Sequence, residues 1–106
     1  MPKRSRPHRE TLLAHLRDPR TAAEYLNAAL DDSDELFLKA IRDVAEAHEL
    51  PMTKIAEGAN VSRENLYRML SESGNPRFEN LTGVLRVLGL RIAVEADLRP
   101  NVPGTS

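Results

Sequence analysis

The chain has no cysteine and no tryptophan, and only two tyrosines and two phenylalanines among its 106 residues. Without cysteine it forms no disulfides and offers no thiolate to a metal, which suits a reducing compartment. No apolar run approaches the roughly 20 residues that span a bilayer, and no hydrophobic segment follows the basic N-terminus as in a secretory signal. We therefore expect a cytoplasmic protein with an aliphatic core and no membrane contact.

Signals of catalysis are missing as well. The three histidines, His8, His15 and His48, are far apart in the sequence, and none has metal-ligand spacing or stands beside a candidate nucleophile. There is no glycine-rich phosphate loop. We expect no catalytic residue, no metal site and no cofactor, so that the protein acts by binding and is not an enzyme.

Charge is unevenly distributed, although the net charge is only −1. Residues 1–20 carry six basic and two acidic side chains, residues 21–50 carry two and eight, and residues 51–77 carry four and three. The acidic middle would repel phosphate and favours a basic partner, although a solvated acidic helix face explains the same run equally well.

Abundant Ala, Leu, Glu and Arg favour an all-α fold. Periodicity predicts helices at 10–16, 19–30, 34–47 and 78–88, with Asp18-Pro19 as a start signal and Gly89 as an end signal. Five regions follow: a flexible basic arm at 1–9, acidic N-terminal helices at 10–50, a DNA-binding domain at 51–89, a strand at 90–97 and a tail at 98–106. The expected inward side chains are, in the third helix, Leu36, Phe37, Ala40, Ile41, Val44 and Ala45, and in the last helix, Phe78, Leu81, Val84, Leu85 and Leu88.

Residues 52–70 predict two short helices joined by a tight turn at Asn60-Val61-Ser62. Asn60 suits the left-handed conformation that ends a helix, and Ser62 suits the N-cap of the next. Apolar residues on both helices can converge on one side of the corner. This is the pattern of a helix-turn-helix, although an ordinary helical hairpin could use the same residues.

In a helix-turn-helix the second helix enters the major groove, so its polar residues are candidate DNA contacts. Arginine can donate a bidentate pair to guanine, asparagine can pair with adenine, and glutamate can accept from cytosine or orient an arginine. Tyrosine can contact a phosphate or a thymine methyl group. The candidate base-reading residues are Arg63, Glu64, Asn65, Tyr67 and Arg68. The candidate phosphate contacts are Lys54, Ser62, Asn75 and Arg77.

Beyond Gly89 the spacing of apolar residues changes to every second position. Leu90, Ile92, Val94 and Ala96 alternate with more polar positions. This alternation predicts a strand, and a lone strand needs a partner for its backbone groups. The simplest partner is the same strand of a second copy, which makes these four residues the expected dimer contact. The sheet edge of another protein, or an extended tail with a hydrated backbone, are the alternatives.

Residues 52–89 resemble the lambda-repressor-like, or XRE-type, helix-turn-helix domains, and residues 12–95 resemble the HigA-like addiction module antidote proteins, antitoxins of type II toxin–antitoxin systems. The motifs that carry the resemblance are AEYLNAAL (23–30), FLKAIRDVA (37–45), VSRENLYR (61–68), GNP (74–76) and LGLR (88–91). The chain departs from the usual pattern at Asn60, where many such domains have Gly, and at Met52, where many have a phosphate-contacting Gln.

The resemblance implies an antitoxin that binds a small basic toxin of the RelE/ParE-like class and represses its own operon as a DNA-binding dimer. Charge complementarity then makes the acidic segment 31–49 the expected toxin-facing surface, through Asp31, Asp32, Asp34, Glu35, Asp43 and Glu46. Apolar docking through Tyr25 and Leu26 is the alternative. The rival functions are a stand-alone phage-type repressor without a toxin and a protein–protein adaptor that has lost DNA binding.

Overall fold

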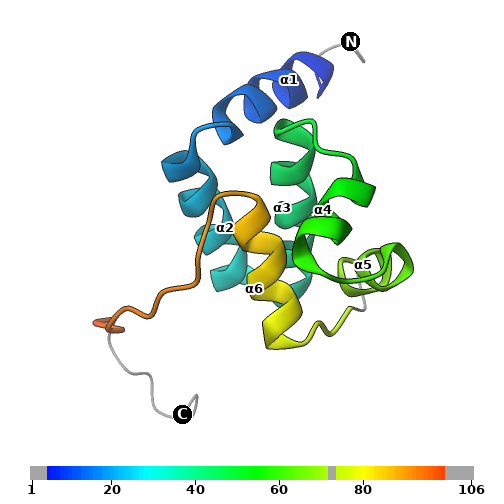
Figure 1. Cartoon of the computed structure of the whole chain (residues 1–106). Coiled ribbons are helices and arrows are strands. Elements are labelled where there is room, and N and C mark those ends of the chain that lie inside the picture. The colour runs from blue at the N-terminus through cyan, green and yellow to red at the C-terminus, as the bar shows by residue number, and fades with distance from the viewer. Residues whose placement is uncertain (1–4, 72–73, 100–106) are drawn as a thin grey trace.

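The computed structural model describes residues 5–71 and 74–99, and in these ranges the chain is helical (Figure 1). The helices are α1 (Ser5–Leu16), α2 (Pro19–Asp32), α3 (Asp34–Ala47), α4 (Met52–Ala59), α5 (Arg63–Met69) and α6 (Phe78–Val87). The all-helical class is confirmed, and the arrangement is compatible with a helix-turn-helix bundle. No helix in the described ranges has the length and apolar character needed to cross a membrane.

Local capping explains where α2 and α3 begin. The Asp18 carboxylate accepts a hydrogen bond from the Arg20 backbone N–H at 3.1 Å, and Pro19 occupies the first helical position. Ser33 alone separates α2 from α3, and its hydroxyl accepts from the Leu36 N–H at 3.1 Å. Both boundaries follow from residues that the sequence places side by side.

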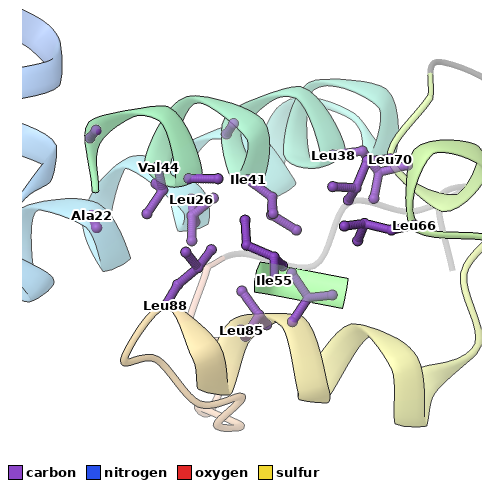
Figure 2. Packing of buried hydrophobic residues seen from close by; sticks show 14 of the residues in the cluster. Ala22, Leu26, Leu38, Ile41, Val44, Ile55, Leu66, Leu70, Leu85 and Leu88 are labelled. Atoms are coloured by element: carbon purple, nitrogen blue, oxygen red, sulfur yellow. The ribbon is translucent and has the colours of Figure 1, made fainter. Parts of the chain in front are cut away.

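The core is aliphatic and is built around α3. Figure 2 shows Ile41, Ile55 and Leu85, from α3, α4 and α6, pointing toward one another. Leu66 and Leu70 close the core from the side of α5, and both are fully buried. Because side chains from all these helices share one interior, α5 is positioned by packing as well as by its turn.

Helices α4 and α6 approach each other closely at small residues. Gly83 of α6 is buried, and a Cβ placed there would lie 3.2 Å from the Ala59 carbonyl oxygen of α4. A Cβ at Gly58 would lie only 2.7 Å from a methyl carbon of Val87. Glycine therefore sets how near the two helices lie.

Some predicted inward residues face solvent. Leu36 is 41% exposed and Phe78 is 70% exposed, because each stands in the first turn of its helix, beyond the layer of neighbouring helices. Residues 5–9 of the predicted flexible arm belong to α1, and residues 1–4 lie outside the described ranges. The predicted tail, 98–106, is described only to Arg99.

The strand predicted at 90–97 is not formed in the described chain. Leu90 packs against the core and its N–H donates to the Leu85 carbonyl at 2.8 Å, while residues 91–98 have no regular secondary structure. Val94 is 95% exposed, and Ile92 and Ala96 also face solvent. A strand is defined by pairing, and within residues 5–71 and 74–99 this segment has no strand to pair with.

Candidate nucleic-acid interface

The turn between α4 and α5 has the predicted conformation. Asn60 adopts φ 60° and ψ 44°, the left-handed region that asparagine tolerates better than most residues. The Val61 N–H donates to the Ala56 carbonyl at 3.0 Å, which closes the end of α4. The Ser62 hydroxyl accepts from the Asn65 N–H at 3.0 Å and caps α5. These bonds fix the direction in which α5 leaves the turn.

Helix α5 has one buried face. Leu66, Met69 and the adjoining Leu70 are at most 4% exposed. A helix of seven residues is not stable alone in water, so this burial is what keeps α5 helical.

The opposite face of α5 is open to solvent. Arg63, Glu64 and Arg68 are exposed, Tyr67 is 54% exposed and Asn65 is half-buried. Neither arginine forms an ion pair with any described residue. The structure thus has the five predicted base-reading residues together on one short helix, and no described residue forms an ion pair with either of its two guanidinium groups.

The predicted phosphate contacts precede and follow α5 in the sequence, and they are also exposed. Lys54 on α4 lies 3.8 Å from the Glu57 carboxylate, a solvent-exposed pair that costs little to break. Ser62 is exposed while its hydroxyl caps α5. Asn75 and Arg77 occupy the connection into α6, where Arg77 is the N-cap residue.

The predicted toxin-facing residues divide into two groups. Leu26 and Asp43 are 4% and 3% exposed, so they do not belong to the accessible surface of this structure. Tyr25 is half-buried and Glu46 is exposed but paired with Arg9. The carboxylates at the α2–α3 corner are exposed to solvent; they are Asp31, Asp32, Asp34 and Glu35.

Asp43 is the centre of a polar cluster that sequence reasoning missed. The Tyr25 hydroxyl donates to its carboxylate at 2.6 Å, Arg9 pairs with it at 3.0 Å and Lys39 lies at 3.6 Å. Burial, and then the hydrogen bond to Asp43, raise the pKa of Tyr25 to about 12. A signal was available: Asp43 stands three residues after Ala40 and beside Val44, on the inward face of α3.

Groups of three or more His, Cys, Asp or Glu side chains able to hold a metal ion do not occur in the part of the chain that the structure describes. The polar groups on α5 are hydrogen-bond donors and acceptors on a convex helix. Such an arrangement is suited to contacting base edges and phosphates.

Comparison with known proteins relates the chain to a family. Residues 6–96 match the family model described as "Probable addiction module antidote protein". An uncharacterized protein of Haemophilus influenzae (strain ATCC 51907 / DSM 11121 / KW20 / Rd) is 40% identical over 82 residues, which cover 76% of this chain and 82% of that protein. No solved structure matches the chain significantly.

Proposed function

Because the chain belongs to the family of probable addiction module antidote proteins, we propose that it is the antitoxin of a type II toxin–antitoxin system. It neutralises a small basic toxin of the RelE/ParE-like class by binding it. The acidic surface at the α2–α3 corner supports a basic partner, since complementary charge steers association and favours the right partner.

The same protein represses its own operon by binding operator DNA. The observation that carries this proposal is the division of α5 into a buried apolar face and an exposed face with Arg63 and Arg68. A capped turn that holds such a helix outward is what a lambda-repressor-like helix-turn-helix requires. Repression is steric, because a bound dimer covers the promoter, and no catalytic step is involved.

Individual side chains have distinct roles in this proposal. Arg63 and Arg68 read guanine, and each good bidentate pair contributes about 1–3 kcal/mol of discrimination. Asn65 pairs with adenine, Glu64 accepts from cytosine or orients an arginine, and Tyr67 contacts a phosphate or a thymine methyl group. The contacts that position the protein on the phosphates are Lys54, Ser62, Asn75 and Arg77.

Operator binding uses a dimer. The segment 90–97, whose residues 91–97 are exposed and unpaired in the described chain, becomes an antiparallel strand when it meets the same segment of a second copy, which satisfies the backbone groups of both. A two-fold axis at this strand places two copies of α5 on one face of the DNA. The operator is then an inverted repeat with half-sites about 34 Å apart.

Fluorescence anisotropy on the chain's own upstream DNA tests repression. Wild type should bind tightly, with an affinity that falls steeply as salt rises. The double variant Arg63→Ala/Arg68→Ala should lose sequence preference, while the matched control Arg20→Ala/Arg42→Ala, which removes two exposed arginines outside the candidate interface, should behave as wild type. Absence of binding by wild type, with and without the toxin, would favour the adaptor.

The toxin half of the proposal is tested separately. The reading frame beside the gene should encode a basic protein of about 100 residues, and the chain should bind that protein and suppress its toxicity on co-expression. A stand-alone repressor would bind the operator equally well but would have no such neighbour. The two experiments can therefore disprove toxin neutralisation and operator repression independently of each other.

A further inference from the structure

A groove lies along the C-terminal segment, which we define as residues 91–98. Its volume is about 490 Å³, within the range of pockets that hold several side chains or a small ligand. One side is lined by the second half of α2 and the start of α3, and the rest by α6, by the connection at residues 74–76, which includes the candidate phosphate contact Asn75, and by the C-terminal segment itself. In Figure 1 this segment lies to the left of α6 and α5 lies to its right, so the groove does not use the outer face of α5.

The groove is apolar inside and open to solvent. Leu30 on α2 is 47% exposed and Ile92 on the C-terminal segment is 40% exposed, and both line it. Phe37 on α3 is half-buried between them and the core. Branched apolar side chains on both walls of one concave surface are typical of a docking site for a partner's apolar side chains.

The rim of the groove is acidic. Asp34 and Glu95 are among its lining residues, and Arg91 is the only positively charged one among the described residues that line it. Three more exposed carboxylates stand next to Asp34 in the sequence, at the α2–α3 corner: Asp31, Asp32 and Glu35. With Arg99 counted beside Arg91, these five carboxylates stand against two guanidinium groups, and the acidic excess favours a cationic partner.

Arg99 is held by Asp97 and lies near enough to this corner for the charge of Asp31 to act on it. Hydrogen bonds to Asp97 and the charge of Asp97, and after them the charge of Asp31, raise the pKa of Arg99. Asp31 thus acts on a cation that lies near the exposed end of the C-terminal segment. The attraction is weak because these groups are exposed, but its sign is the one a basic partner requires.

We infer that the toxin docks in this groove, with one basic amphipathic segment whose apolar side chains enter between Leu30 and Ile92 and whose Lys and Arg side chains meet the acidic rim. The inference rests on the proposed antitoxin function and adds the binding surface and the chemistry of the bound segment. A second copy of this chain fits less well, because the segment it would offer, 91–99, carries two acidic and two basic side chains and does not complement the rim.

Two matched substitutions on the α2–α3 wall test the inference. The probe is the purified protein encoded by the neighbouring reading frame, titrated into the full chain by calorimetry. Leu30→Arg places a positive charge inside the groove and should weaken binding by more than about tenfold, as expected for a buried contact in an interface centre. Leu36→Arg adds the same charge at the same corner, but Leu36 is 41% exposed and does not line the groove, so we expect a change below about threefold.

A second pair tests the opposite wall in the same way. Ile92→Arg should weaken binding by more than about tenfold, whereas Leu98→Arg should not, because Leu98 is 90% exposed, lies outside the groove and is not one of the expected dimer contacts. All four positions face solvent, so circular dichroism should show unchanged helix content. A variant that unfolds would be replaced by Leu30→Gln or Ile92→Gln, with the same ranking expected.

The outcomes separate this inference from the proposed function. If wild type binds the toxin and all four variants bind equally well, the groove is not the docking site although the antitoxin function stands. If Leu30→Arg, which lies outside the proposed dimer strand, changes the molecular mass of the chain alone and leaves toxin affinity unchanged, the groove holds a second copy and the inference is overturned. If wild type does not bind the neighbouring protein, the antitoxin function itself fails.

Discussion

Asp43 is a buried carboxylate whose three partners come from three helices. Arg9 belongs to α1, Tyr25 to α2 and Lys39 to α3, so one side chain links the N-terminal half of the molecule. A buried charge is tolerated only when it is paired and hydrogen-bonded, and removing a partner from such a group is costly. The cluster therefore holds α1 and α2 in place on α3.

The Tyr25 hydroxyl makes the stability of the fold depend on pH at the alkaline end. Its pKa rises from 10.0 to about 12 on folding, so between these values the unfolded chain loses the proton while the folded chain retains it. The contribution of the hydroxyl is complete below pH 10 and is lost as pH rises through 12. Wild type should be more stable than Tyr25→Phe by about 1–2 kcal/mol at pH 8, and this difference should shrink between pH 10 and 12.

Urea unfolding of the two proteins at pH 8, 10 and 11 measures that difference. A constant difference over this range would mean that the hydroxyl does not carry the pH dependence.

Which residues were predictable depended on how far away their partners are. Asn60 and Ser62 were predicted with the right conformations because their hydrogen-bond partners are close in the sequence. Asn60 bonds to Ala56, and Ser62 bonds to Asn65. The burial of Asp43 was missed because Arg9 and Tyr25 lie 34 and 18 residues away in the sequence. Periodicity also says nothing about which neighbour covers a helix end, which is why Phe78 was misplaced.

At the scale of elements, the crossing of α4 and α6 is set by a glycine. A methyl group at Gly58 would overlap Val87, whose branched side chain has little freedom to turn away. The same methyl group would otherwise favour α4, because alanine is the better helix former by about 1 kcal/mol. At position 58, steric overlap with Val87 and the higher helix propensity of alanine therefore have opposite effects on stability.

We predict that Gly58→Ala destabilises the wild-type chain by about 1–2 kcal/mol, as overpacking does in a close contact. In the Val87→Ala background, where the overlap is relieved, the same substitution should stabilise by up to about 1 kcal/mol. Thermal or urea unfolding of wild type, the two single variants and the double variant gives the coupling free energy between positions 58 and 87. Equal effects of Gly58→Ala in both backgrounds would contradict the steric explanation.

The helices were easier to predict than the end of the chain. Asp18, Ser33 and Gly89 mark helix boundaries by their own backbone and side-chain chemistry, and the observed bounds lie within two residues of those marks. The start of α1 was placed five residues late because that helix has no such signal. Alternation at 90–97 describes side chains, whereas a strand also needs a second backbone to pair with.

At the scale of the whole molecule, the C-terminal segment contributes little to the folded monomer and much to the proposed assembly. Its residues are exposed, and the last contact with the core is made by Leu90. Folding and assembly are thus carried by different parts of the chain, which makes them separable by truncation.

A chain that ends after Leu90 should keep its helix content, and its unfolding midpoint should shift by only a few degrees. It should be a monomer by light scattering, where we expect the full chain to be a dimer, and its affinity for operator DNA should fall by tenfold or more because one half-site is lost. The full chain with Leu98→Ala, a substitution outside the four expected dimer contacts, serves as a control for side-chain loss. A truncated chain that remains dimeric would place the dimer contact on the helices.

The two faces of α5 have a consequence for how such a protein evolves. Leu66 and Met69 are buried in the core and keep α5 in place. The exposed residues Arg63, Glu64, Tyr67 and Arg68 are not part of the core. After gene duplication, one copy can therefore change these four residues freely without becoming unstable on the way. If α5 reads operator DNA as we propose, new operator preferences become accessible by single substitutions, and paralogous systems in one genome can stop cross-regulating each other while the fold stays the same.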